Sequence, residues 1–174
     1  MNAVLSYVSS SDSRIADRLR GWSPPRWFCL AMLAATRFGD GWGWLGVAGA
    51  LAAAGDAGHA ALAAGVPAAA LSVAGFMVLK RAFKRPRPCE IVPHPLFRVR
   101  PPDRFSFPSG HTMAAFSVGT VIALHFPLLA PALGLVALGI AVSRVVLGLH
   151  YLSDVVVGAL LGTLFGFTAY VAFR

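Results

Sequence analysis

The sequence has few charged residues and few cysteines. Asp, Glu, Lys and Arg make up 13% of the 174 residues, about half of the ~25% that is usual in soluble domains. Long polar or low-complexity tracts are also missing, which excludes an intrinsically disordered chain. The two cysteines, Cys29 and Cys89, have no Cys or His partner at metal-ligand spacing. We therefore expect neither a disulfide nor a metal site.

Apolar residues take the place of the missing charge. They make up 57% of the chain, and the mean hydropathy is +0.69. Three stretches have no charged side chain: 23 residues after Asp56, 39 after Arg104 and 19 after Asp154. Because about 20 residues cross a ~30 Å hydrocarbon core, the middle stretch holds two spans and each of the others holds one. The sequence predicts an integral membrane protein.

Two shorter apolar runs, 27–36 and 42–54, precede Asp56. With them we predict an all-α, polytopic membrane helix bundle of about six spans, near residues 27–38, 42–55, 60–82, 109–126, 128–148 and 151–172. Seven prolines rule out regular helix in the intervening loop, 83–108. Residues 1–174 are expected to form one domain.

Residues 1–25 are expected to form an N-terminal interfacial segment and not a secretory signal, because four arginines precede the first apolar run. A short helix capped by Ser11 or Asp12 would place Ile15 and Leu19 on one face. In the last helix, glycines recur at every fourth position, at Gly158, Gly162 and Gly166. We expect this stripe to pack inside the monomer and not at a dimer seam.

The net charge of +8 is concentrated in one segment, because eight of the fifteen cations lie between Lys80 and Arg104. They do not cover an amphipathic face and accompany no recognition motif, so we predict no nucleic-acid partner. The last four predicted spans begin or end near Lys80, Ser109, Arg144 and His150. Consecutive spans run antiparallel, so these four termini share one membrane face. The polar residues are therefore expected to converge there.

The first cluster at that face is the basic run from Lys80 to Pro88, which contains Arg87. A juxtamembrane anchor for anionic lipid head groups is one interpretation. Direct binding of phosphate is the other, because Lys and Arg both bind it and Arg does so as a bidentate fork.

The second cluster is Pro108-Ser109-Gly110-His111, at a predicted helix start. Ser109 is suited to capping the helix, and Gly110 allows close approach of a ligand to the backbone. Free N–H groups and the helix dipole would then attract an anion, with His111 beside it as an acid or base. An ordinary cap followed by an interfacial histidine is the alternative.

The third cluster is Ser143-Arg144, followed by His150 and Asp154. Spacing of four residues places His150 and Asp154 on one helical face, where the carboxylate can accept the Nδ1 proton. The Nε2 atom is then an unprotonated nucleophile. A purely structural pair at a helix start is the alternative. Asp154 is also the one acidic residue in the last 70 positions, where an unpaired carboxylate near a membrane would be costly.

Together, Lys80-x6-Arg87-Pro88, Pro108-Ser109-Gly110-His111 and Ser143-Arg144-x5-His150-x3-Asp154 resemble the three-part signature of the type 2 phosphatidic acid phosphatase (PAP2) superfamily. The apolar helices are similar to its membrane lipid phosphatase branch, and the small size resembles compact bacterial members. The resemblance covers residues 80–154; residues 1–79 add no motif.

The resemblance implies a metal-free phosphatase without a cofactor. His150 would attack phosphorus to give a phosphohistidine, with Asp154 orienting it, and His111 would protonate the leaving oxygen and then deprotonate water. Phosphate would be held by five groups, Lys80, Arg87, Ser109, Gly110 and Arg144.

The remaining polar residues are expected to play lesser parts. Head-group attraction is predicted for six cations outside the signature, Arg81, Lys84, Arg85, Arg98, Arg100 and Arg104. No role is expected for three isolated histidines, His59, His94 and His125. Arg37 and Asp40 lie on the active-site face beside Trp42 and Trp44, where an interfacial aromatic belt is preferred over contact with a head group.

The expected substrates are lipid phosphates at head-group depth in the bilayer. The resembling family includes enzymes for undecaprenyl diphosphate, phosphatidylglycerophosphate, phosphatidic acid and the lipid A phosphate, and the sequence does not choose among them. A lipid phosphotransferase, a non-catalytic lipid-binding or transport protein, and a vanadium haloperoxidase are the alternatives, the last disfavoured because those proteins are soluble. Oligomeric state is open, and a route for the lipid between helices is expected.

Six spans would place both termini on the face opposite the active site. That face would hold five cations, Arg14, Arg18, Arg20, Arg26 and Arg174, against seven on the active-site face once three phosphate ligands are set aside. The positive-inside rule does not decide between five and seven. Because the resembling family mostly works on the outer face, we expect the site to face the periplasm, or another extracytoplasmic side, of the inner (plasma) membrane.

Overall fold

The computed structural model describes residues 2–92 and 103–173. These residues form helices and their connections, with no strand beyond one isolated bridge between Pro86 and Phe105. The helices are α1 (Asn2–Arg20), α2 (Arg26–Gly39), α3 (Trp42–Ala52), α4 (Gly55–Phe83), α5 (Pro88–Ile91), α6 (Gly110–His125), the 3₁₀ helix η1 (Pro127–Leu129), α7 (Ala130–Val146) and α8 (Leu152–Phe173). The predicted all-α class is confirmed.

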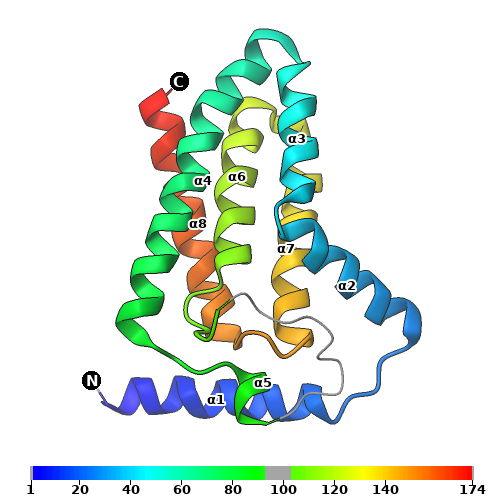
Figure 1. Cartoon of the computed structure of the whole chain (residues 1–174), viewed down its shortest axis with the longest axis vertical. Helices are drawn as coiled ribbons and strands as arrows, with labels where there is room; N and C mark the ends of the chain where they lie inside the picture. The colour runs from blue at the N-terminus through cyan, green and yellow to red at the C-terminus, as the bar shows by residue number, and fades with distance from the viewer. Residues whose placement is uncertain (1, 93–102, 174) are drawn as a thin grey trace.

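The centre of the bundle is α6, which packs against α4, α7 and α8 (Figure 1). The glycine stripe of α8 allows this packing. A Cβ added at Gly158, Gly162 or Gly166 would collide with a carbonyl oxygen of α6 or its N-cap. The two helix backbones therefore approach too closely for any larger residue, which confirms that the stripe packs within the chain.

Three helical segments of the described chain are long and apolar enough to cross a membrane, namely Gly55–Phe83, Pro127–Val146 and Leu152–Phe173. The first two spans expected from the sequence do not form as two separate crossings. Helices α2 and α3 have 14 and 11 residues, and they continue in the same general direction along the bundle (Figure 1). Only Asp40 and Gly41 separate them, and Gly41 has φ 116. Each helix alone is shorter than a crossing, so together they make one interrupted passage and not two antiparallel spans.

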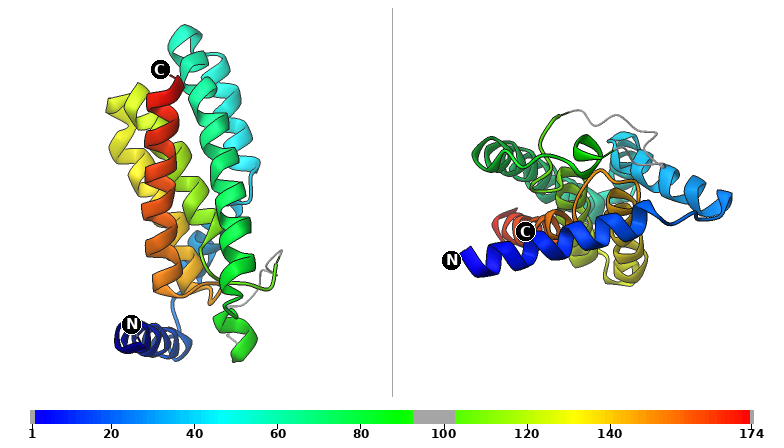
Figure 2. Two further views of the ribbon diagram at one scale, coloured as in Figure 1. Left: turned by 90° about the vertical axis from the view of Figure 1, so that its left-hand side faces the viewer. Right: turned by 90° about the horizontal axis from the view of Figure 1, so that it is seen from below.

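This passage places the chain ends at opposite ends of the bundle. Helix α1 runs crosswise beneath the end where α8 begins, whereas the C-terminus lies at the far end (Figures 1 and 2). The prediction that both termini lie on one face is therefore wrong. Ser11 and Asp12 are also not helix caps, because α1 is continuous from Asn2 to Arg20 and both residues lie within it.

The loop 83–108 contains one short helix that the sequence analysis excluded. Helix α5 begins at Pro88, and proline is tolerated at a first helical position because that N–H needs no partner within the helix. Within α5, the Cys89 N–H donates to the Gly148 carbonyl at 3.1 Å. The loop is thereby tied to the connection between α7 and α8.

Candidate active site

Helices α2, α3, α4, α6 and α7 and the turn before α8 meet around one cavity of about 920 Å³. Its lining includes six of the eight predicted site residues, Lys80, Arg87, Gly110, His111, Arg144 and His150. Ser109 and Asp154 lie just behind this lining and are fully buried. The structure therefore brings the distant polar residues together at one end of the bundle, as the sequence predicts.

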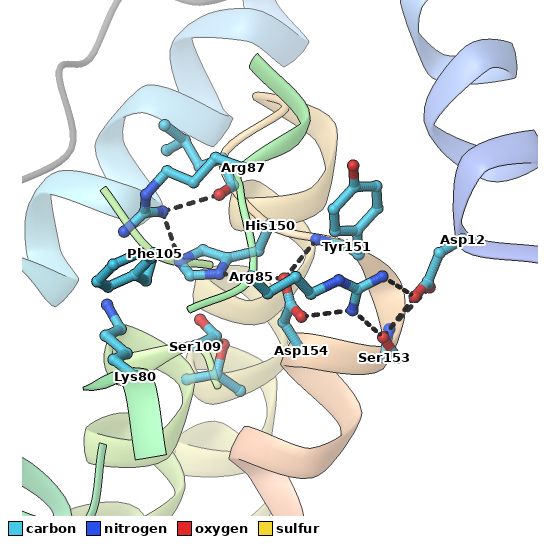
Figure 3. Close-up of polar contacts among 12 residues, drawn as sticks. Asp12, Lys80, Arg85, Arg87, Phe105, Ser109, His150, Tyr151, Ser153 and Asp154 are labelled. Carbon is cyan, nitrogen blue, oxygen red and sulfur yellow. Dashed lines mark hydrogen bonds and ion pairs between the residues drawn. The ribbon is translucent and has the colours of Figure 1, made fainter. Parts of the chain in front are cut away.

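His150 lies in the turn before α8 and is buried. Its Nε2 is 3.0 Å from Nη1 of Arg87 (Figure 3). A guanidinium has donors but no acceptor, so Nε2 accepts this bond with its lone pair and the neutral ring has its proton on Nδ1. Burial, followed by the positive charges of Arg87 and Arg144, lowers the pKa of His150 well below its ordinary value. The ring is therefore neutral, with its lone pair toward the cations.

Asp154 lies on the other side of this ring. Its Oδ2 is 3.5 Å from His150 Nδ1 and accepts the Tyr151 N–H at 2.9 Å. At 3.5 Å the contact is an ion-pair distance and not a formed hydrogen bond, and Nδ1 has no hydrogen-bond partner within the described residues. The sequence spacing therefore brings the pair together, and a small movement of the ring would close the bond.

Arg144 is buried and incompletely paired. Its Nη1 donates to the hydroxyl of Thr36 on α2, whereas its Nε has no partner within the described residues. A buried guanidinium N–H without an acceptor costs free energy, and an anion in the cavity would supply one. Thr36 gave no signal in the sequence, because it is an ordinary polar residue in an apolar run.

A loop carboxylate joins the other two cations of the cavity. Asp103 accepts hydrogen bonds from Lys80 Nζ at 2.7 Å and from Arg87 Nη2 at 2.9 Å. Burial raises the pKa of Asp103, but the hydrogen bonds and charges of Lys80 and Arg87 outweigh it and hold the pKa below its usual value. Nothing in the sequence singled out Asp103. Its contacts show that the pair of cations binds an anionic group.

The Pro-Ser-Gly-His segment forms the start of α6, but Ser109 does not cap it through its side chain. The Ser109 hydroxyl is 3.0 Å from the Thr112 hydroxyl, and its N–H donates to the Asp154 carbonyl at 3.1 Å. The expected capping bond is therefore wrong. Gly110 is needed for packing as well as for access, since a Cβ there would lie 3.1 Å from the Phe76 ring of α4.

His111 has a carboxylate partner that the sequence analysis assigned elsewhere. Its Nε2 lies 2.7 Å from Oδ1 of Asp40, at the C-terminal cap of α2. Asp40 was attributed to an aromatic belt, and the one available signal was a carboxylate between two apolar runs on the active-site face. Both residues line the cavity.

Arg85 is not free for lipid head groups, contrary to expectation. It donates to Asp154 Oδ1 at 2.8 Å and to Asp12 Oδ2 at 2.7 Å (Figure 3). Two carboxylates therefore hold its guanidinium inside the protein. Lys84 and Arg81 are exposed, as head-group attraction requires.

The remaining loop cations and histidines named in the sequence analysis have no shared place in the structure. Arg104 is exposed and lines the cavity, whereas His94, Arg98 and Arg100 lie outside the described residues. The two remaining histidines make local backbone contacts, to the carbonyls of Ala52 for His59 and Val121 for His125. Nothing in these contacts gives either histidine a role at the site.

The cavity is suited to an anion. Within residues 2–92 and 103–173, no group of three or more His, Cys, Asp or Glu side chains is placed to hold a metal ion. Six cations line the cavity instead, and three of them are the predicted phosphate ligands Lys80, Arg87 and Arg144. Arginine and lysine N–H groups are the usual partners of phosphate oxygens.

Comparison with known proteins supports the same kind of site. The family model described as "PAP2 superfamily" matches residues 59–174. The chain is 38% identical over 128 residues to decaprenylphosphoryl-5-phosphoribose phosphatase of Mycolicibacterium smegmatis, covering 72% of this chain and 68% of that protein.

Two crystal structures have the same architecture. The PAP2 type phosphatidylglycerolphosphate phosphatase of Bacillus subtilis aligns with a TM-score of 0.75 and 26% identity, over 99% of this chain and 87% of that one. LpxE of Aquifex aeolicus aligns with a TM-score of 0.73 and 28% identity, over 87% and 90%. The family match and these alignments include the helices that meet at the cavity, so this chain belongs to the PAP2 superfamily, among its membrane phosphatases.

Proposed function

We propose that this membrane phosphatase hydrolyses a lipid phosphate monoester or diphosphate through a phosphohistidine at His150. One observation carries the proposal: the Nε2 lone pair of a buried, neutral histidine faces a cavity lined by Lys80, Arg87 and Arg144. A nucleophile surrounded by fixed cations is the arrangement that phosphoryl transfer needs, because charge on the phosphoryl oxygens must be balanced as phosphorus is attacked.

In the first step His150 Nε2 forms a bond to phosphorus while the bond to the lipid oxygen breaks. His111 supplies the proton that this leaving oxygen takes, and Asp154 balances the positive charge that develops on His150. Lys80, Arg87, Arg144, Ser109 and the Gly110 amide hold the phosphoryl oxygens. For phosphate to enter, Asp103 must release Lys80 and Arg87, and Arg87 must turn from Nε2 toward oxygen.

In the second step water attacks the phosphohistidine and gives its proton to His111. The bond from phosphorus to His150 breaks, and inorganic phosphate leaves with both histidines restored to their starting forms. Every role in this cycle belongs to a side chain or backbone group of the protein, so we propose that neither a metal nor a cofactor takes part.

A lipid substrate is supported by the apolar side of the cavity. Trp44 of α3, Ala114 of α6 and three residues of α4 line it beyond the cations, namely Val73, Phe76 and Met77. Val73 and Met77 are exposed, so this wall opens toward the outside of the bundle. An acyl or prenyl tail could lie along α4 while its phosphate reaches His150, which allows entry between helices.

The proposed substrate class covers the substrates named for the relatives and does not single out one of them. Decaprenylphosphoryl-5-phosphoribose, phosphatidylglycerophosphate and lipid A phosphatases are all named among similar proteins. We propose a phosphate ester or diphosphate on a prenyl, glycerolipid or lipid A anchor as the substrate. Transfer of the phosphoryl group to a second lipid in place of water uses the same residues and is an outcome of the test below.

The test is phosphate release by detergent-purified protein in the presence of EDTA, on a panel of lipid monophosphates and diphosphates. Wild-type turnover that survives EDTA and is absent from His150→Ala is the expected result, and the relative rates rank the substrates. Phosphorylated second lipid in place of free phosphate identifies a transferase. Equal turnover by both proteins overturns the role of His150, and lipid binding without turnover indicates a non-catalytic protein.

Residues 1–174 are proposed to form one domain of the plasma membrane, with α1 on the membrane surface at the active-site end. This placement changes the charge balance. Asp12 of α1 contacts Arg85 and Ser153, so the arginines of α1 lie at the same end as the cavity and not opposite it. The positive-inside rule then favours a cytoplasmic active site, against the extracytoplasmic one that the resemblance implies.

Cysteine labelling decides between the two sides. A cysteine placed at Lys84, which is exposed beside the cavity end, is treated in whole cells with a membrane-impermeant maleimide. Protection until the cells are opened supports the cytoplasmic side, and labelling of intact cells supports the extracytoplasmic side. The test uses a Cys29→Ala, Cys89→Ala background, since both native thiols are free.

A further inference from the structure

Arg85 is the centre of a polar network behind His150, on the side away from the cavity (Figure 3). Its Nη1 donates to Asp154 Oδ1 at 2.8 Å and to the Ser153 hydroxyl at 2.7 Å, and its Nη2 donates to Asp12 Oδ2 at 2.7 Å. The guanidinium also lies 4.1 Å from the centre of the Tyr151 ring. A planar fork held at both nitrogens and on one face has little freedom to move.

Asp12 joins α1 to this network. Its carboxylate is 4% exposed, and besides Arg85 it accepts the Ser153 N–H at 3.1 Å and the Ser153 hydroxyl. Ser153 lies in the first turn of α8, one residue before Asp154. A helix on the outside of the bundle therefore places a buried carboxylate next to the start of α8. Charged residues are rarely buried in proteins unless they are paired, as Asp12 is here.

Charge explains why both acidic residues are needed. Arg85 alone would cancel the negative charge of Asp154, which His150 needs when it becomes positive. With Asp12 present, two carboxylates share one guanidinium, and the group keeps one net negative charge. The carboxylate of Asp154 is thus fixed in place and still able to stabilise a cationic ring.

We propose that Arg85 and Asp12 are positioning residues for catalysis: they hold Asp154 against His150, so that α1 forms part of the catalytic apparatus. The inference rests on the proposed function of His150 and Asp154. Neither Arg85 nor Asp12 lines the cavity, so neither acts on the substrate directly.

The test is steady-state kinetics on the panel lipid that the wild type hydrolyses fastest. Arg85→Gln is expected to lower kcat by about 100-fold, within the range for residues that orient a base, and to leave KM within about two-fold. Asp12→Asn is expected to lower kcat by roughly ten-fold. In the Arg85→Gln background, Asp12→Asn should cost less than it does in the wild type, because its contact with Arg85 is already lost and only its bonds to Ser153 remain.

Matched controls come from α1. Arg18→Gln changes an exposed cation, and Asp17→Asn changes an exposed carboxylate that pairs with Arg20. Both should keep wild-type kcat. Arg85→Lys should retain more activity than Arg85→Gln, since an ammonium can still contact one carboxylate but lacks the fork to hold two.

A wild-type kcat with raised KM in Arg85→Gln would overturn the proposal in favour of head-group binding. Equal effects of Asp12→Asn and Asp17→Asn would remove Asp12 from it. Thermal unfolding of each variant in detergent separates lost catalysis from lost folding. If Arg85→Gln does not fold, Arg85→Lys and Asp12→Asn make the same kcat and KM comparison. Failure of wild-type turnover on every lipid refutes the proposed function itself, whereas wild-type turnover with unaffected variants refutes this inference alone.

Discussion

Two histidine–carboxylate pairs border the same cavity and are built differently. His150 and Asp154 are four residues apart, and the histidine side chain is 1% exposed with its Nδ1 3.5 Å from the carboxylate. His111 and Asp40 come from different helices, 71 positions apart, and the histidine side chain is 18% exposed with its Nε2 2.7 Å from the carboxylate.

The difference indicates a division of work. The buried ring is kept neutral and its lone pair is held toward the phosphate cations, which suits a nucleophile. The more open ring reaches the cavity and the solvent, which suits a group that must give a proton to a leaving oxygen and take one from water. Each of the following experiments changes one pair and uses the other as its reference.

The largest contrast is expected between the two histidines themselves. His150→Ala should abolish turnover on every substrate, by about 10⁴-fold or more, because the atom that bonds to phosphorus is gone. His111→Ala should lose about 10²-fold to 10⁴-fold on a lipid phosphate. On an aryl phosphate the first turnover should be nearly unaffected, because a phenolate leaves without help from an acid, whereas later turnovers should slow because His111 also accepts the proton of water in the second step.

The measurements are kcat on a lipid phosphate and the first-turnover rate of phenolate release from p-nitrophenyl phosphate, for each variant beside the wild type. Quenching in alkaline denaturant, in which phosphohistidine is stable, should trap a phosphohistidine in His111→Ala and none in His150→Ala. If His150→Ala recovers activity on the aryl substrate while His111→Ala does not, the two assignments are reversed.

The next contrast is between the two carboxylates. Asp154→Asn should lower kcat by about 10³-fold, because it removes the charge that balances His150 and also a partner of Arg85. Asp40→Asn should lower it by roughly ten-fold, since His111 keeps a hydrogen-bond partner and loses only its orientation by a charge. In the first turnover, the loss in Asp40→Asn should be confined to lipid substrates and be absent with p-nitrophenyl phosphate.

Asp56→Asn is the control, because Asp56 is an exposed carboxylate at the start of α4, away from the cavity. Comparable first-turnover losses in Asp40→Asn on both substrate types would show that Asp40 supports the fold of the site and not His111 in particular.

The same two pairs show how far the sequence could lead. His150 and Asp154 were found because four-residue spacing on a helix brings two side chains together, and the pair does meet although His150 lies in the turn just before α8. Asp40 was not assigned to His111, because the interruption at Gly41 turns α2 and α3 into one passage, and no local pattern states which distant side chain a helix end will meet. Six spans were counted from the same two runs for the same reason.

Arg85 was assigned wrongly from the sequence and Asp103 was missed, for a related reason. Both lie in or beside the basic loop. A cation in such a loop is usually interpreted as attracting lipid head groups, and a carboxylate as a solvated residue. Their partners, Asp154 and Asp12 for Arg85, and Lys80 and Arg87 for Asp103, are set by how the loop folds back over the helix ends. Composition and periodicity carry information on which residues are buried in helices, but not on loop contacts of this range.

The smallest expected effect concerns pH, and it separates the buried histidine from an ordinary one. Five groups face His150: Arg87, Arg144, Lys80, His111 and Asp154. Burial and the positive members of this set lower the pKa of His150 well below 6.5, so the neutral, nucleophilic form persists as the pH falls. The value of kcat/KM, which reports on the free enzyme, should therefore change little between pH 7.0 and 5.5 beyond the change that ionisation of the substrate itself causes. A histidine with a pKa of about 6.5 would lose roughly eight-fold over that range.

Arg87→Gln provides the comparison for that pH series. Removing a cation that contacts Nε2 at 3.0 Å should raise the pKa of His150 toward its ordinary value, so the acid limb of the rate profile should move to higher pH. Ionisation of the substrate phosphate affects wild type and variant alike, so the shift between the two profiles reports on the enzyme. Superimposable profiles would mean that Arg87 binds phosphate without setting the charge of the nucleophile, and burial alone would then have to keep His150 neutral.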